Sequence, residues 1–361
     1  MLYTTLGKNG PRISRLSMGC GRLPENDDDS TQLIHAAIDA GVNFFETATF
    51  YCNNRCIEKT GLGIKGRRDE VMVQVKVGTD PDSSADGYRR AAEEQFTRMG
   101  IDRADFFMVG WIAWERMHLV LRKGGALEGI RKMQDEGLVK HVGFTGHDTP
   151  EGFIKVLETG VFSSMTVSYN LLNRMYEKTL DRAGELGIGV IVMNPVGGGM
   201  LGAPSPTLQK LLPGGSATPA GAALRFVLSH PAVTTACSGM NSLAELRENV
   251  AAVESAAPLS PKELLQVHRI LDEYNALGQQ FCTACKYCQP CPSNVDIPSN
   301  FRLLNYHKVY GLLDWARAQY AGMKEDTRAT ACTRCGQCEP KCPQKIRIIE
   351  QLAEVASVLG P

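Results

Sequence analysis

The chain lacks a long apolar run, an excess of either charge and, outside its last quarter, more than a few cysteines. No apolar stretch approaches the roughly 20 residues that a membrane-spanning helix needs. The beginning, MLYTTLGKNGPRIS, has neither the basic start nor the apolar run of a signal peptide. Because 39 lysines and arginines balance 39 aspartates and glutamates, no overall field attracts nucleic acid or an anionic membrane. We therefore expect a cytoplasmic protein without membrane insertion or nucleic-acid partners.

Eight of the twelve cysteines lie between residues 282 and 342. The other four are Cys20, Cys52, Cys56 and Cys237, and we expect Cys20 and Cys237 to be buried at strand ends. A secreted disulfide-bonded protein is usually small, with cysteines throughout its chain. Here two tight arrays follow a long region with few cysteines. That pattern is typical of thiolates that hold metal in a reducing compartment.

The second array reads Cys332-x2-Cys335-x2-Cys338-x3-Cys342-Pro343. This is the run of bacterial ferredoxins, in which three thiolates hold one cubane cluster and the cysteine before proline reaches the other. Small residues at Thr333 and Gly336 would let the backbone curl around the metal core. We therefore predict iron–sulfur ligation by this array.

The first array, Cys282-x2-Cys285-x2-Cys288-x2-Cys291-Pro292, is one residue shorter before its last cysteine. With the second array it predicts two 4Fe–4S clusters with crossed ligation. Cys342 would complete the cluster of the first array, and Cys291 that of the second. A single cluster is one alternative, and structural zinc, which also uses C-x2-C pairs, is another.

Between residues 15 and 255, short apolar or β-branched runs alternate with helical patterns. Continuous apolar runs are typical of parallel strands that are buried on both faces. Eight such strands, each followed by a helix, predict an α/β fold with a (β/α)8 barrel of the TIM type. An open doubly wound sheet is the alternative, but no G-x-G-x-x-G follows the first strand. The predicted strands are Arg15–Gly19, Asn43–Glu46, Val71–Val77, Asp105–Trp111, Val139–Thr145, Ser164–Tyr169, Gly189–Met193 and Val233–Ser238.

Local signals mark the ends of several elements. Ser30 is expected to cap a helix that stops at Gly41, and Ser242 to cap another. Residues 1–12 contain the turn LGKNGP and predict a hairpin that closes one end of the barrel.

Two prolines, Pro258 and Pro261, mark the expected domain boundary. The barrel is assigned to residues 1–257. Residues 258–361 would hold a linker helix, over 262–277, and an α-helical ferredoxin-like iron–sulfur domain. Two further helical segments are expected in that domain, at 301–320 and 346–359.

Several segments of the predicted barrel resemble the aldo/keto reductase superfamily. With the cysteine arrays, the resemblance is to its subgroup with a C-terminal ferredoxin-like extension. The segments are GVNFFETATFY at 41–51, VQVKVG at 73–78, YNLLNR at 169–174, NPVGGGMLG at 194–202 and SG…LRENV at 238–250.

The resemblance implies a catalytic tyrosine at Tyr51, which donates a proton to a carbonyl, and a lysine at Lys76. A neighbouring cation must lower the pKa of such a phenol, which is near 10 when unperturbed. Two positions depart from the family pattern. Glu46 replaces the usual aspartate, and Gly110 replaces the usual histidine. His147, at the end of the fifth predicted strand, is our candidate to replace that imidazole.

The resemblance also implies where a nicotinamide cofactor would bind. Met193 stands where an aromatic ring usually stacks on nicotinamide, and Glu245 where an arginine usually holds the 2′-phosphate. NAD(H), or no nicotinamide, is therefore expected rather than NADP(H). The implied cofactor-binding residues are Asn170, Gly197, Gly198, Gly199, Glu248 and Asn249.

We therefore predict an oxidoreductase of the aldo/keto reductase type that acts on a small carbonyl or hydroxyl compound. Its two clusters would exchange electrons with a partner protein. A non-catalytic electron carrier with a degenerate barrel site and a redox-neutral lyase are the alternatives. Cys52 and Cys56 follow Tyr51 and are interpreted as packing thiols, although a thiol beside the site could react or bind metal.

Overall fold

The computed structural model describes residues 1–80, 83–171, 173–202, 218–255, 257–277, 282, 284–310 and 313–360. The chain divides into two compact units. The first is formed by Met1–Asn170, Arg174–Pro195 and Ala223–Pro258. The second consists mainly of the chain from Leu259 onward, with two short segments that begin at Leu171 and Val196.

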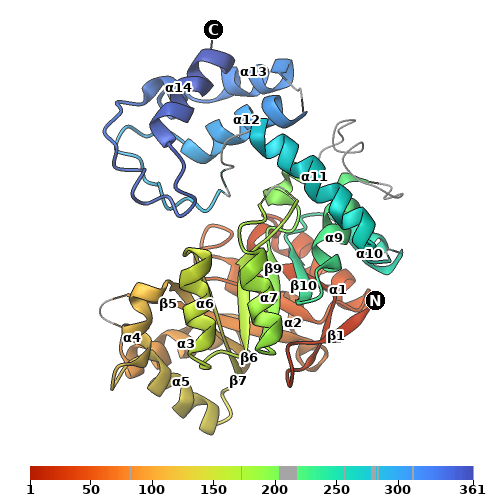
Figure 1. Cartoon of the computed structure of the whole chain (residues 1–361). Helices are drawn as coiled ribbons and strands as arrows, with labels where there is room; N and C mark the ends of the chain where they lie inside the picture. Colours follow the sequence, from red (N-terminus) through yellow and green to blue (C-terminus); the bar gives the residue numbers. More distant parts are fainter. Residues whose placement is uncertain are drawn as a thin grey trace. The chain divides into compact units, whose positions relative to one another are not determined.

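The first unit contains a closed barrel of eight parallel strands, in the order β10-β3-β4-β5-β6-β7-β8-β9 (Figure 1). This confirms the predicted fold, and each predicted strand is present to within one residue at either end. The strands are β3 Leu16–Gly19, β4 Phe44–Glu46, β5 Met72–Gly78, β6 Ala104–Ile112, β7 Val139–Gly146, β8 Ser164–Ser168, β9 Gly189–Met193 and β10 Val233–Ser238.

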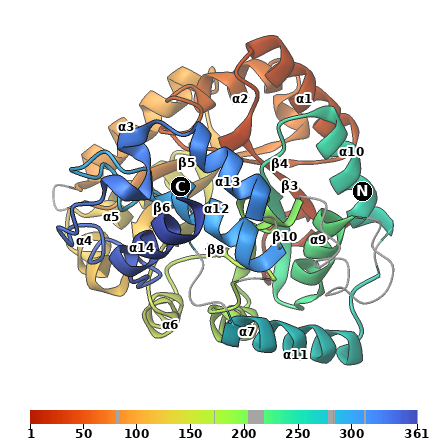
Figure 2. The ribbon, with the colours of Figure 1, turned by 90° about the horizontal axis from the view of Figure 1, so that it is seen from above.

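Helices lie outside the ring of strands, as the view in Figure 2 shows for α1, α3, α6 and α10. Each strand from β3 to β9 is followed by at least one helix before the next strand, so the loops at the carboxyl ends of the strands meet at one mouth. The helices are α1 Asp27–Asp39, α2 Cys56–Ile64, α3 Ala85–Met99, α4 Met117–Leu121, α5 Ala126–Asp135, α6 Pro150–Glu158, α7 Glu177–Glu185, α9 Pro219–Ser229 and α10 Leu243–Ser255.

The amino-terminal hairpin is present as predicted. Its strands, β1 Tyr3–Thr5 and β2 Arg12–Ser14, are antiparallel, with Tyr3 opposite Ser14. Leu6 and Ile13 are buried in one cluster with the barrel side chains of Phe44, Phe106 and Ile191. The hairpin therefore closes the amino-terminal end of the barrel.

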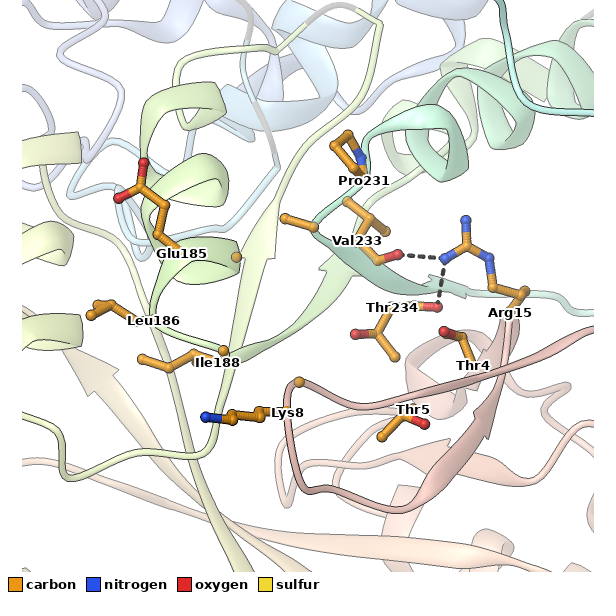
Figure 3. Close-up of a pocket in the computed structure, with 14 residues that line it drawn as sticks. Thr4, Thr5, Lys8, Arg15, Glu185, Leu186, Ile188, Pro231, Val233 and Thr234 are labelled. Carbon is orange, nitrogen blue, oxygen red and sulfur yellow. Dashed lines mark hydrogen bonds between the residues drawn. The ribbon is translucent and has the colours of Figure 1, made fainter.

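A cavity of about 540 Å³ lies at this amino-terminal end, between the hairpin and the loops that precede β9 and β10 (Figure 3). Arg15 lines this cavity, and its guanidinium group donates hydrogen bonds to the carbonyl oxygens of Leu228, Val233 and Thr234. The Arg15 side chain therefore connects the start of β3 to the backbone before and within β10, at the end of the barrel opposite the βα loops. We assign this cavity a structural role.

The predicted cap of α1 is wrong. Asn26 caps this helix, because its side-chain oxygen accepts hydrogen bonds from the backbone N–H groups of Asp28 and Asp29, at 2.8 and 3.1 Å. Ser30 lies inside the helix and donates to the carbonyl oxygen of Pro24. Acidic residues in the first turn favour this earlier start, since they face the positive end of the helix dipole. Ser242 does cap α10, where its hydroxyl accepts from the Glu245 N–H at 3.2 Å.

The second unit contains α11 Pro261–Leu277, α12 Ile297–Tyr310, α13 Leu313–Gly322 and α14 Ile348–Leu359. The helical segment expected over 301–320 thus consists of two helices rather than one. Buried side chains of α12, α13 and α14 form one core with the cysteine arrays. They include Phe301, Leu304, Tyr320 and Val355. Among the described residues, none of the helices has both the length and the hydrophobicity needed to cross a bilayer.

Candidate active site and cysteine arrays

The candidate catalytic residues predicted from the sequence lie at the ends of strands on the βα side of the barrel. Glu46 is the last residue of β4, and Lys76 lies near the end of β5. Gly110 is paired with Gly78 across β5 and β6, and His147 directly follows β7. Because parallel strands present their carboxyl ends at one edge, these positions lie around the same opening.

The centre of the site is an ion pair between the Glu46 carboxylate and the Lys76 ammonium group. Both side chains are buried, with 8% and 11% of their surface exposed. Gln74, which points to the same side of β5 as Lys76, donates a hydrogen bond to Glu46 Oε1 at 3.2 Å. The Gln95 side chain, from α3, bonds both the N–H and the carbonyl of Lys76, each at 3.0 Å. The pair is therefore fixed in both side chain and backbone.

The Lys76 end of this pair lies over the ring of Tyr51. Lys76 Nζ is 5.3 Å from the centroid of the ring. Gly21 lies against the ring, since a Cβ at that position would be 3.1 Å from it. The negative charge of Glu46 raises the pKa of Tyr51, the positive charge of Lys76 lowers it, and burial raises it, with a net increase. This corrects the expected lowering: Lys76 is paired with Glu46, so the phenol stays protonated near neutral pH.

Lys76 itself stays charged. Burial lowers its pKa, but the Glu46 carboxylate and Tyr51 raise it, and the net change is an increase. His147 shows the opposite result. Burial and the nearby Lys76 charge lower the pKa of His147 to about 4, so its imidazole is neutral at pH 7.

Two aromatic side chains that the sequence reasoning did not select lie next to Tyr51. Phe50 meets the Tyr51 ring edge-on at 4.9 Å, and Trp111 stacks on Phe50 at 6.3 Å. Trp111 covers Gly78, where a Cβ would come within 2.3 Å of the indole. Phe50 and Trp111 are 53% and 44% exposed. Gln74 was also missed, although its spacing of two residues from Lys76 places both on one face of the strand.

The proposed cofactor residues follow β8, β9 and β10. Asn170 donates a hydrogen bond to the carbonyl of Asn194 at 3.0 Å, and Asn249 donates one to Ser238 Oγ at 2.8 Å. Both amides are buried; that of Asn249 connects α10 to the end of β10. Glu248 is partly exposed on α10. Gly197, Gly198 and Gly199 have φ values of +60°, +68° and +98°, which glycine adopts readily.

The described residues of the two cysteine arrays share two backbone features. The first cysteine of each accepts a hydrogen bond from the N–H two residues later, from Ala284 at 3.3 Å and from Arg334 at 3.4 Å. Positive φ angles recur at equivalent places, at Ala284 and Lys286 in the first array and at Arg334 and Gly336 in the second. This repeated left-handed backbone makes the chain curl around a common interior in both arrays. The positive φ angle of Gly336 agrees with the prediction that a small residue there lets the backbone curl.

The last cysteine of the second array lies with the first array. Cys282, Cys285, Cys288 and Cys342 line one cavity whose remaining wall is mostly apolar. Burial first, and then the neighbouring Cys285 and Cys342, raise the pKa of Cys282 to about 12. The four thiols thus surround one space, as crossed ligation of a cluster requires.

Three thiols of the second group, those of Cys291, Cys332 and Cys338, also lie near one another. Burial raises the pKa of Cys338, and Cys291 and Cys332 are close enough to add to the increase. Ser293 and Thr333, one from each array, are hydrogen-bonded at 2.9 Å. Cys335 is exposed. Among the described residues, no three histidine, cysteine or acidic side chains converge on a point as ligands of one ion do. The four thiols around the cavity of the first array fit a 4Fe–4S cluster.

Comparison with known sequences assigns a family to each of two parts of the chain. Residues 15–272 match the Aldo/keto reductase family, and residues 281–346 match a 4Fe-4S dicluster domain. The chain therefore belongs to the aldo/keto reductase family and carries a C-terminal 4Fe–4S dicluster domain. It is an oxidoreductase of the aldo/keto reductase type.

Individual relatives are distant. The chain is 24% identical over 306 residues to the uncharacterized oxidoreductase YqkF of Bacillus subtilis, with 75% of this chain and 97% of that protein covered. It is 25% identical over 305 residues to L-galactose dehydrogenase of Arabidopsis thaliana, with 74% and 93% covered. The holo form of aldo-keto reductase AKR11C1 from Bacillus halodurans has the same fold, with a TM-score of 0.66 and 23% identity over 75% of this chain and 96% of that chain.

We expect anaerobically purified protein to contain about eight iron atoms and eight acid-labile sulfides per chain, as two cubanes require. Cys335→Ala should reduce both contents by about half, because it removes one ligand of a single cluster. Cys237→Ala is the matched control, since that buried thiol lies on β10 and belongs to neither array. Iron and sulfide analysis with visible absorbance measures the outcome. Stoichiometric zinc without acid-labile sulfide would contradict the cluster assignment.

Proposed function

We propose that this protein is an iron–sulfur oxidoreductase that converts a small carbonyl or hydroxyl compound at the barrel mouth. The observation that carries the proposal is the Glu46–Lys76 ion pair next to the phenol of Tyr51, a residue that is partly exposed. A buried charge pair with a protonated phenol in an opening is the arrangement that general acid catalysis needs. The name of the relative L-galactose dehydrogenase, which refers to a small hydroxyl-rich compound, supports this substrate class.

Tyr51 is the group that would exchange a proton with the substrate oxygen. Its raised pKa keeps the phenol protonated near neutral pH. An alkoxide is a stronger base than a phenolate, so the phenol can still protonate an oxygen that is becoming a hydroxyl. The Lys76 charge, 5.3 Å from the ring centroid, stabilises the phenolate that remains. His147, neutral at pH 7, can offer a hydrogen bond to the same oxygen.

When bound, 4Fe–4S clusters supply single electrons, whereas a nicotinamide supplies hydride. The two arrays hold thiols in positions that fit the clusters. At the nicotinamide positions, Met193 provides no ring for stacking, and Glu245 places a carboxylate where the 2′-phosphate would lie. We therefore propose that reducing equivalents pass through the clusters, with NADH preferred to NADPH if a nicotinamide binds.

Gly110 supports a second candidate. A Cβ at this position would lie 3.4–3.5 Å from its nearest neighbours, which include Lys76 Cγ. The structure thus has room for a Cβ at this position, but glycine supplies no hydrogen-bond donor there. Loss of such a donor costs about 3–4 kcal/mol of transition-state stabilisation in comparable sites. A redox-neutral lyase that uses only proton transfer, or an electron carrier without chemistry in the barrel, would not need it.

Tyr51→Phe should lower turnover of an accepted carbonyl compound at least hundredfold, because only the phenol can pass the proton. Cluster content and folding should not change, since the ring is kept. Tyr3→Phe is the matched control: Tyr3 lies on the hairpin, at the opposite end of the barrel, and its hydroxyl donates a hydrogen bond to the Gly41 carbonyl. Anaerobic turnover over a panel of carbonyl compounds, with several electron donors, measures the effect. Activity retained within about tenfold would move catalysis away from Tyr51, and inactivity of wild-type protein on the whole panel would favour the second candidate.

NADPH should bind at least tenfold more weakly than NADH, because Glu245 would repel a 2′-phosphate. Glu245→Gln should narrow this ratio. It removes the charge but keeps an oxygen that can accept the Asn241 N–H, now at 2.8 Å. Asp135→Asn, at the far end of α5, is a charge-matched control. Isothermal titration of anaerobic protein tests the prediction. Micromolar NADPH affinity with hydride transfer that is independent of the clusters would overturn the proposed electron path.

The proposed electron-transfer partner is an acidic protein that approaches the second array. Cys335 is exposed there, as are the basic side chains of Arg334, Lys341 and Lys345. Positive charge around an exposed ligand favours association with an acidic carrier and makes the rate depend on salt. We therefore propose these basic residues as the docking surface for the carrier.

Replacement of Lys341 and Lys345 by glutamine should slow reduction by an acidic reduced ferredoxin about tenfold at low ionic strength. The difference in rate between the double variant and wild type should shrink in high salt, because screening weakens the attraction between wild-type protein and the acidic ferredoxin. Lys262→Gln, at the start of α11, is the control. Stopped-flow absorbance of the clusters follows the reaction. Equal rates for the double variant and wild type at low salt would place the docking surface elsewhere.

A further inference from the structure

The proposed function leaves two cysteines beside Tyr51 without a role. Cys52 Sγ lies 3.2 Å from the carbonyl oxygen of Cys20, and Cys56 Sγ lies 3.4 Å from the same oxygen. The two sulfurs also share a hydrogen bond with each other. The thiol of Cys20 is directed instead to the carbonyl of Met18, at 3.8 Å. The side chains therefore form a reduced, side-by-side pair, Cys52–Cys56.

The loop between the two cysteines holds this pair together. Cys52, Asn53 and Asn54 all have positive φ angles, of +50°, +55° and +65°. The turn is closed by hydrogen bonds from the Arg55 N–H to the Cys52 carbonyl and from the Cys56 N–H to the Tyr51 carbonyl. A left-handed conformation is unusual for cysteine and persists only where the surroundings enforce it. Here it directs the Cys52 sulfur back toward Cys56.

The two thiols differ in access and in acidity. Cys52 is partly exposed, and Cys56 is fully buried at the start of α2. The hydrogen bond from Cys56 lowers the pKa of Cys52 to about 7; burial opposes this change, and the Leu23 backbone and the Lys59 charge add to it. The same hydrogen bond and burial raise the pKa of Cys56. A thiol with a pKa near the ambient pH is the best attacking group in disulfide exchange.

We propose that Cys52 and Cys56 form a thiol–disulfide exchange site that oxidises to a disulfide at the expense of low-molecular-weight disulfides. The Cys52 thiolate attacks one sulfur of the small disulfide, which breaks its S–S bond and releases the first product as a thiolate, and this thiolate takes up a proton from solvent to become the first thiol. Cys56 then attacks the Cys52 sulfur of the mixed disulfide, loses its proton and releases the second thiol. Two electrons pass from the cysteine pair to the small disulfide, which ends as two thiols.

This chemistry does not depend on Tyr51 being catalytic, and its test does not measure turnover of a carbonyl compound. Full-length protein with its clusters intact is incubated anaerobically with bis(2-hydroxyethyl) disulfide, alkylated with iodoacetamide and digested with trypsin. Cleavage after Arg55 separates peptide Leu23–Arg55, which contains Cys52, from peptide Cys56–Lys59. The two peptides stay joined only when the disulfide has formed, and mass spectrometry detects the pair.

Wild-type protein should yield the joined peptides, while cluster absorbance stays constant. Cys56→Ser, or Cys56→Ala if serine is not tolerated, should instead accumulate the mixed disulfide on Cys52, because the resolving thiol is absent. Cys52→Ser should react at least tenfold more slowly than wild type, since the remaining thiol is buried. Cys237→Ser is the control and should react at the wild-type rate. The proposal fails if wild type keeps both thiols alkylated, if Cys52→Ser reacts as fast as wild type, or if the Cys56 variants form no mixed disulfide.

Discussion

The ion pair between Glu46 and Lys76 is the interaction on which the barrel site depends. Two opposite charges are buried at the ends of neighbouring strands, and removal of one partner from such a pair typically costs about 3–5 kcal/mol. Gln74, on β5 like Lys76, and Gln95, on α3, hold the pair in place by hydrogen bonds. Because the Glu46 charge opposes the Lys76 charge, Lys76 does not produce a net decrease in the pKa of Tyr51. The phenol therefore keeps its proton, which suits donation to a substrate oxygen.

The second unit depends on a different constraint, the curl of the backbone around a metal core. The two arrays repeat the same positive φ angles and the same N–H to sulfur hydrogen bonds. The last cysteine of the second array lies with the first three cysteines of the first, in one cavity. Clusters shared in this way would join segments that are far apart in the sequence. Metal binding would then also stabilise the fold of this unit.

Much of the fold could be predicted because its signals are local. Continuous apolar runs identified all eight strands, and an LGKNGP turn identified the hairpin. Competing local signals caused the errors. Ser30 and Asn26 are both good caps, and the acidic residues after Asn26 favour the earlier start. The segment 301–320 has one helical pattern but forms α12 and α13, and the pattern did not mark where α12 ends.

The positions of the strands, the family of the barrel and the spacing of the cysteine arrays follow from the amino-acid sequence alone, since each depends on residues that are close together in the chain. Which distant side chains meet is settled only when the chain folds. Lys76 is 30 residues from Glu46 yet forms an ion pair with it, and that pairing reverses the pKa shift expected for Tyr51. Cys52 and Cys56 look like packing thiols until the fold places the Cys20 carbonyl between them. The physical reason is that charge and hydrogen bonding act over a few ångströms in space, whatever the separation along the chain.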